Sequence, residues 1–174
     1  MSFSNELFMQ RKTVGMSQTE LARRIGVTQS TISDYECGKD VPPDNAFRMT
    51  RVLESDRLLA EFCWEYKTGF FNVPVLNKVD DHSIVGMGVL IEEAAELISN
   101  IERLRKLVLN KNDRRQFTKD EWKQLLEYEE QIVDIMPAIQ MHLIKMSEIF
   151  GLDLREMERR LELKMSMKGY YKRS

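Results

Sequence analysis

The sequence has few of the residues that typify disulfide-rich, strand-rich or membrane-spanning proteins. Two cysteines, Cys37 and Cys63, are too few for a disulfide framework, and they do not have the spacing of a zinc site. Eight glycines and four prolines among 174 residues, with a charged fraction of 31%, favour long helices over strands. No apolar run approaches the ~18 residues of a membrane span, and the first residues lack the order of a signal peptide. We therefore expect an all-α cytoplasmic protein with no membrane partner.

An excess of positive charge is also missing. The chain has 26 lysines and arginines against 28 acidic residues, which gives a net charge of −2. This balance excludes a nonspecific coat on nucleic acid, which relies on a large positive charge. It leaves open a small DNA reader whose basic residues are few and local. The hydrophobic share of 43% is enough to build a core, so a disordered chain is excluded as well.

Residues 1–67 have the pattern of short helices separated by turns. Ser17 and Glu20 are spaced as a capping box at the start of a helix, and Gly26 stands where that helix needs a left-handed residue to end. Thr28 then caps another helix after a very short turn. Two short helices joined by a tight turn that contains glycine form a helix-turn-helix. We expect this unit to be the first domain.

The segment SQTELARRIGVTQSTISDYECGKDVPP resembles the helix-turn-helix of the XRE family, which comprises phage-repressor and Cro-like regulators. The resemblance covers residues 4–54. It implies a transcriptional regulator, with repression the expected outcome, whose partner is a double-stranded DNA operator. It also implies that Arg11 pairs with Glu36 and so ties the first helix to the end of the recognition helix.

The face of the recognition helix that points away from the core is expected to read DNA. On a helix that starts at Thr28, residues Ile32 and Tyr35 point inward, together with Val27 before it. Gln29 on the opposite side can pair with adenine, and Asp34 can accept a hydrogen bond from cytosine. The residues expected to contact bases or phosphates are Gln18, Thr28, Gln29, Ser30, Thr31, Ser33, Asp34 and Lys39.

Residues 68–88 are expected to form a linker that packs across a domain surface. Residues 89–174 are expected to form a helical domain that mediates dimerisation and that could bind a small-molecule or protein effector. The apolar seam that predicts dimerisation consists of Leu90, Ala94, Leu97, Ile101, Leu104 and Val108. A capping box at Thr118 predicts a long helix over 119–150, with a bend expected at Pro137. A last helix is expected to begin near Asp153. Residues 1–56 have seven basic and eight acidic side chains, so specific binding should need a homodimer with two half-sites. The part after Asp56 also resembles the tail of longer Gram-positive XRE regulators.

A second resemblance favours an enzyme instead. The stretch EEAAE at residues 92–96 is similar to the EExxE motif of the MazG-like nucleotide pyrophosphohydrolases. That family implies magnesium, which Glu93, Glu96 and Asp134 would hold. Gln131 stands where the family has a fourth carboxylate, so we lean against an enzyme and expect no cofactor. A nucleotide-sensing regulator descended from that fold remains an alternative. His82 and His142 have no spaced partners and are expected to be packed or surface residues.

Overall fold

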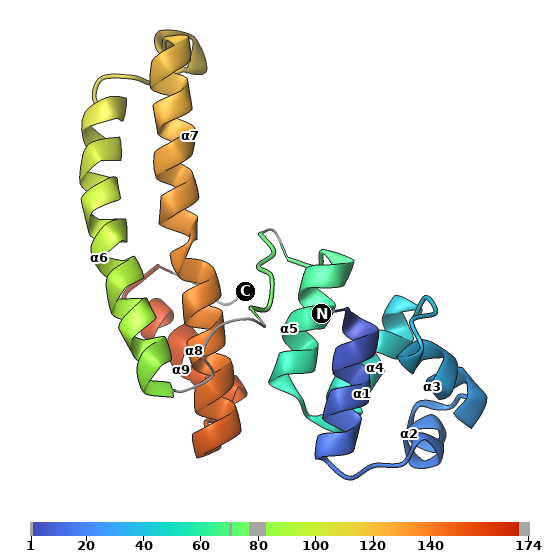
Figure 1. The fold of residues 1–174 in the computed structure, drawn as a ribbon. Helices are drawn as coiled ribbons and strands as arrows, with labels where there is room; N and C mark the ends of the chain where they lie inside the picture. The colour runs from blue at the N-terminus through green and yellow to red at the C-terminus, as the bar shows by residue number, and fades with distance from the viewer. Residues whose placement is uncertain (1, 70, 77–82, 171–174) are drawn as a thin grey trace.

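The computed structural model describes residues 2–69, 71–76 and 83–170, and these residues contain helices and no strand. The all-α prediction is therefore confirmed. The N-terminal helices are α1 (Phe3–Thr13), α2 (Gln18–Ile25), α3 (Gln29–Glu36), α4 (Pro43–Leu53) and α5 (Asp56–Tyr66). The C-terminal helices are α6 (Ser83–Val108), α7 (Lys119–Val133), α8 (Ile135–Phe150) and α9 (Leu154–Met167), with a 3₁₀ turn at Arg114–Gln116. In Figure 1 they form an elongated hairpin beside a rounder N-terminal domain. None of the described helices is long and apolar enough to cross a membrane.

The N-terminal helices begin and end where the cap residues predict. The Ser17 hydroxyl accepts a hydrogen bond from the backbone N–H of Glu20, and Gly26 ends α2 with a φ of 79°. Thr28 caps α3 in the same way by accepting from the backbone N–H of Thr31.

One part of the predicted capping box is wrong. The Glu20 carboxylate does not return a bond to Ser17 but accepts from Arg23 at 2.9 Å and from Arg24 at 2.7 Å. Two charged donors one turn away are stronger partners than a single backbone N–H. Their hydrogen bonds lower the pKa of Glu20 to about 2.

The N-terminal domain has one apolar core to which all its helices contribute. Its fully buried side chains include Phe3, Leu7, Leu21, Ile32, Met49 and Leu58. In α3, Ile32 and Tyr35 face this core and Val27 packs against its edge, as the helix periodicity predicts. Burying an isoleucine stabilises a fold by about 1.5–3 kcal/mol, so the inward side of α3 fixes the rotation of the helix. The polar side of α3 is thereby held outward.

The C-terminal hairpin differs from the sequence expectation at two helix ends. Its first helix begins at Ser83, inside the expected linker 68–88. The expected single helix over 119–150 is interrupted at Asp134, where α7 ends and α8 begins. Pro137 has no N–H to donate to the carbonyl four residues earlier, and its ring crowds that carbonyl, which explains a break one turn before it. The capping box at Thr118 and Glu121 is confirmed, and Gly151 ends α8 with a φ of 67°.

The linker and α8 attach the hairpin to the N-terminal domain. Val75 is buried in a small cluster with Met141 and Ile144 of α8, against which Ala60 of α5 packs. An ion pair joins Arg57 to Glu148, with 2.8 Å between Nε and Oε1. The Ser147 hydroxyl also donates to the Asp56 carboxylate at 2.5 Å. Within the expected linker, Val75 is the residue buried in this cluster, whereas His82 lies outside the described residues.

The long C-terminal helices bury little apolar surface in the single chain. Among the described residues, no apolar side chain of α6, α7 or α9 is buried. The predicted seam on α6 is half-buried, except Ile101, which is 47% exposed. A neighbouring row, here called the outer stripe, is exposed to solvent and consists of Met87, Ile91, Ile98 and Ile101. The hairpin therefore presents an apolar face that its own helices do not cover.

Candidate nucleic-acid interface

The first turns of α3 present uncharged polar side chains on their outward side. Thr28, Gln29 and Ser30 at its start are exposed, and Thr31 and Ser33 are half-buried. Hydroxyl hydrogen bonds join Thr28 to Ser30 at 2.9 Å and to Thr31 at 2.8 Å. Because the apolar side of α3 is fixed in the core, these residues form one surface at the end of the domain. Such a surface offers hydrogen bonds and little charge.

A buried ion pair lies directly behind this surface. The Arg11 guanidinium binds the Glu36 carboxylate in a two-pronged pair, with Nε at 2.5 Å from Oε1 and Nη2 at 2.8 Å from Oε2. Each side chain is only 4% exposed. The third arm of the guanidinium donates to the backbone carbonyl of Met16 at 2.7 Å. Arg11 thus joins α1, the turn before α2 and the last residue of α3, in the pairing that the family resemblance implies.

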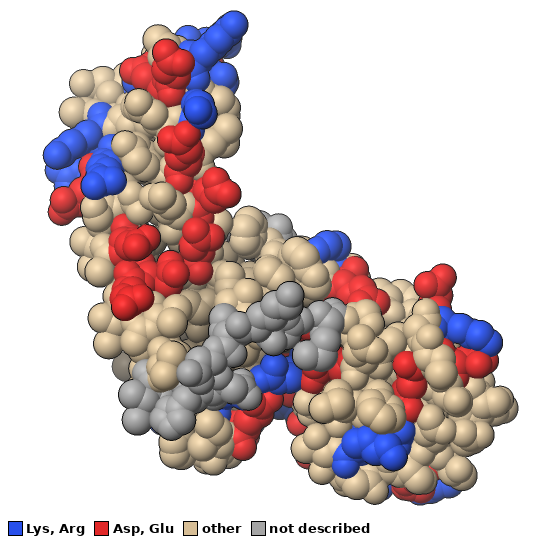
Figure 2. Space-filling view, in the orientation of Figure 1, with Lys and Arg blue, Asp and Glu red and all other residues tan. Residues whose placement is uncertain are grey.

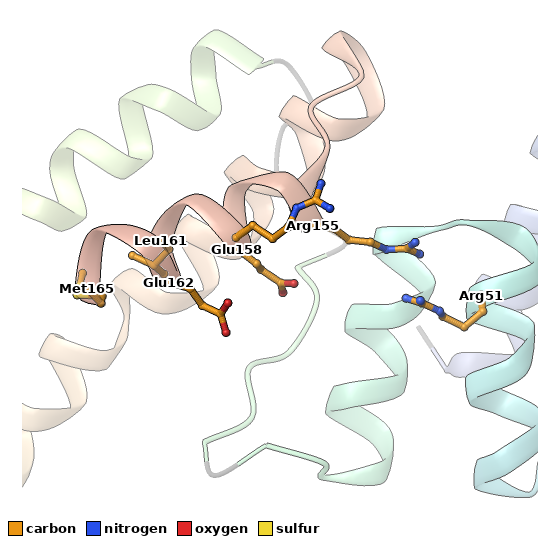
Figure 3. A pocket seen from close by; sticks show the side chains of 7 residues that line it. Arg51, Arg155, Glu158, Leu161, Glu162 and Met165 are labelled. Atoms are coloured by element: carbon orange, nitrogen blue, oxygen red, sulfur yellow. The ribbon is translucent and has the colours of Figure 1, made fainter. Parts of the chain in front are cut away.

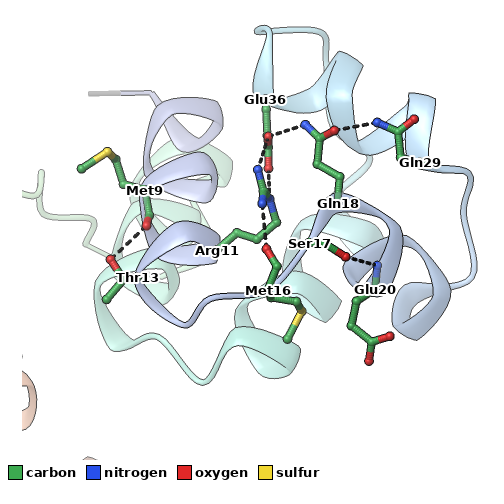
Figure 4. Close-up of polar contacts among 9 residues, drawn as sticks. All are labelled: Met9, Arg11, Thr13, Met16, Ser17, Gln18, Glu20, Gln29 and Glu36. Atoms are coloured by element: carbon green, nitrogen blue, oxygen red, sulfur yellow. Dashed lines mark hydrogen bonds and ion pairs between the residues drawn. The ribbon is translucent and has the colours of Figure 1, made fainter.

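From this ion pair a chain of hydrogen bonds runs to the start of the recognition helix (Figure 4). The Gln18 amide nitrogen donates to Glu36 at 2.7 Å, and the Gln18 amide oxygen accepts from the Gln29 amide nitrogen at 2.6 Å. Gln29 therefore has its amide oriented by α2. Its oxygen and its second N–H remain available, and these are the two groups that a bidentate pair with adenine uses.

Sequence reasoning placed Gln18 at a phosphate and missed its link to Gln29. The partners of Gln18 are Gln29 and Glu36, which are 11 and 18 residues away in the sequence, so no local spacing reveals these hydrogen bonds. One N–H of its amide remains for a phosphate oxygen.

Asp34 and Lys39 pair with each other at the end of α3. The distance between Lys39 Nζ and Asp34 Oδ2 is 2.7 Å, and the two side chains are 67% and 48% exposed. An exposed ion pair of this kind contributes about 0–1 kcal/mol to stability. A DNA phosphate could therefore replace Asp34 as the partner of Lys39. Until then, Lys39 offsets the negative charge that Asp34 brings to this surface.

The acidic residues of the hairpin approach one another without forming a metal site. Burial raises the pKa of Glu93, and the nearby charges of Glu96, Asp134 and Glu92 raise it further. In the described part of the chain, however, no three His, Cys, Asp or Glu side chains are arranged to hold a metal ion. Figure 2 shows a row of acidic side chains along one face of the hairpin. Such a face repels the phosphates of a nucleic acid.

The comparison with protein families agrees with this geometry. Residues 7–57 match a family model described as helix-turn-helix. This segment is an XRE-type helix-turn-helix domain. Searches of curated proteins and of solved structures found no match for the chain. The helix-turn-helix domain identifies a DNA-binding transcription regulator, with α2 and α3 as its two characteristic helices. The matched residues end at the start of α5, so the family model does not cover the hairpin.

Proposed function

We propose that this protein is a cytoplasmic, sequence-specific repressor that reads an operator in the DNA major groove with α3. The observation that carries this proposal is the chain of hydrogen bonds from Arg11 and Glu36 through Gln18 to Gln29. An amide held in one orientation at the start of a recognition helix favours one base over the others. Repression would follow if the operator overlaps a promoter, because the bound protein would then exclude the polymerase.

The outward side of α3 has little charge, so contacts with bases are the main means by which it distinguishes one DNA sequence from another. Gln29, Ser30 and Ser33 are uncharged, and Lys39 already has a partner in Asp34. Phosphate contacts fix the position of a protein on DNA but carry no direct sequence information. We therefore expect weak nonspecific binding and a steep dependence on sequence.

Replacing Gln29 with alanine should weaken binding to the operator by about 1–3 kcal/mol and leave nonspecific binding almost unchanged. The loss should vanish when the base pair that Gln29 reads is itself changed. Fluorescence anisotropy with operator duplexes altered at one base pair at a time measures both effects. Thr13→Ala is the matched control, because the Thr13 hydroxyl bonds only within α1, to the Met9 carbonyl. An equal loss on every duplex would contradict a reading role for Gln29.

The repressor is proposed to act as a homodimer that forms through the outer stripe of α6. Ile91 is 70% exposed and Ile98 is 64% exposed, one heptad apart on the same side of the helix. Exposed isoleucines in a row are typical of an interface and not of a solvated helix. A second copy of the chain carries the same outer stripe, so the stripes of two protomers can pack against each other. Two recognition helices can then meet half-sites about 34 Å apart.

The MazG-like alternative is supported by one observation, the influence of Glu96 and Asp134 on the pKa of Glu93. Gln131 adds no charge, and the carboxylates do not converge as a magnesium site requires, so we derive no catalytic step. We expect the full chain with magnesium to release no pyrophosphate from nucleoside triphosphates. Release that Glu93→Ala abolishes, and that the α6 control Glu102→Ala retains, would overturn this expectation.

A further inference from the structure

A cavity of about 260 Å³ lies where the helix-turn-helix domain meets the C-terminal helices. Its walls come from the end of α4, from α5, from α8 and from the first turns of α9. It adjoins a wider depression of about 720 Å³ between α4 and α9, which Figure 3 shows. The two share Arg51, Arg155 and Glu158. Anything bound here touches both parts of the molecule.

Two arginines from different parts of the chain line this cavity. Figure 3 shows the Arg51 side chain extending from α4 toward the first turn of α9, where Arg155 lies. Within the described structure neither guanidinium forms an ion pair, whereas Arg159 and Arg160 on the same helix both bind Glu156. Both arginines are exposed to solvent at the mouth of the cavity, and an anion between them would offset the repulsion of their like charges.

The carboxylates that also line the cavity do not fill this role. Asp56 accepts its hydrogen bond from Ser147, and Glu54 and Glu158 are exposed to solvent without an ion pair among the described residues. Among the described residues, neither Arg51 nor Arg155 forms an ion pair with these carboxylates.

Gln140 of α8 is a third donor without an acceptor. It lines the same cavity, and its amide nitrogen is buried with no hydrogen-bond partner. A buried donor left unpaired is unfavourable, and an oxygen of a bound molecule would satisfy it. Part of the wall is apolar, with Leu59, Leu143 and Ile144 among the lining side chains. Donors beside an apolar wall fit a ligand with an oxygen-bearing head and an apolar body.

We propose that this cavity binds a small organic anion. Its carboxylate or phosphate group lies between Arg51 and Arg155, its oxygen accepts from Gln140, and its apolar part packs on Leu59 and Leu143. The size of the cavity restricts the ligand to a small metabolite. Binding joins the DNA-binding domain to α8 and α9 through one molecule.

The test uses the full chain without DNA, so its result is independent of the proposed operator binding. Phenyl phosphate and phenylacetate are titrated and followed by NMR, with benzyl alcohol and benzylamine as uncharged and cationic controls. We expect at least one anion to bind with a dissociation constant of about 1–10 mM, as suits so small a ligand, and neither control to bind. The anion that binds more tightly distinguishes a phosphate ligand from a carboxylate ligand.

Substitutions then locate the site. Arg51→Gln and Arg155→Gln should each weaken binding about tenfold or more, because each removes a charge-assisted hydrogen bond. Arg160→Gln, on the same helix but bound to Glu156, should change nothing. Gln140→Leu should weaken binding while the ligand-free chain unfolds at the same or a higher temperature. Failure of both anions to bind, preferential binding of benzylamine, or binding that survives both Arg51→Gln and Arg155→Gln would overturn the site.

Discussion

Replacing Arg11 with methionine is expected to lower the free energy of unfolding of the helix-turn-helix domain by about 3–5 kcal/mol. The change leaves the Glu36 carboxylate buried without its cation and removes the donor to the Met16 carbonyl. Urea unfolding of the full chain measures the loss. Trp64 on α5 reports on this domain when Trp122 on α7 is replaced by phenylalanine. The loss approaches the whole stability of many small domains.

Two further variants separate the buried charge from ordinary loss of contacts. Arg11→Met combined with Glu36→Leu removes both charges and should recover most of the stability. Arg23→Met, which removes an exposed ion pair with Glu20, should leave the urea midpoint almost unchanged. The double variant should fold and yet lose operator specificity, because Gln18 no longer has Glu36 to hold it. A single Arg11→Met variant as stable as the wild type would contradict this account of the ion pair.

Replacing Ile98 with glutamate is expected to split the homodimer and abolish operator binding. Ile98 is 64% exposed in the single chain, so the change should leave the fold of each protomer intact. In a two-fold interface both protomers contribute the new carboxylate, and burying each one disfavours dimerisation by several kcal/mol. The dissociation constant of the dimer should rise at least about a thousandfold. Light scattering at micromolar concentration measures the change in mass.

The control on the same helix is Ser99→Glu, which adds the same charge at an exposed position outside the outer stripe. It should remain dimeric. Leu97→Glu, by contrast, places a charge on the half-buried side of α6 and should destabilise the hairpin itself. A wild type that is monomeric at micromolar concentration, or an Ile98→Glu variant that remains dimeric, would contradict the proposed interface.

The sequence predicts best those features that depend on near neighbours. The caps at Ser17, Thr28 and Thr118 and the left-handed glycines at Gly26 and Gly151 follow from rules that act within one helical turn. The Arg11–Glu36 pair, 25 residues apart, came from the family resemblance and not from spacing.

The features that the sequence did not predict depend on which surfaces meet in three dimensions. Two apolar rows on α6 share Ile101 and have the same period, so periodicity cannot tell the row that faces α7 and α8 from the outer stripe. The bond between Gln18 and Gln29 requires the packing of α2 against α3. The cavity at Arg51 and Arg155 requires the placement of α9 beside α4, on which sequence spacing carries no information.

Selection of bound duplexes from a random double-stranded DNA library by the full chain, at moderate salt, tests the central claim most directly. A dimeric reader should enrich one sequence that contains two half-sites related by two-fold symmetry, with centres about 34 Å apart. The same selection with Gln29→Ala should lose the preference at one base pair in each half-site and keep the spacing. A library in which no sequence is enriched, or one in which Gln29→Ala enriches the same sequence as strongly as the wild type, would contradict the account.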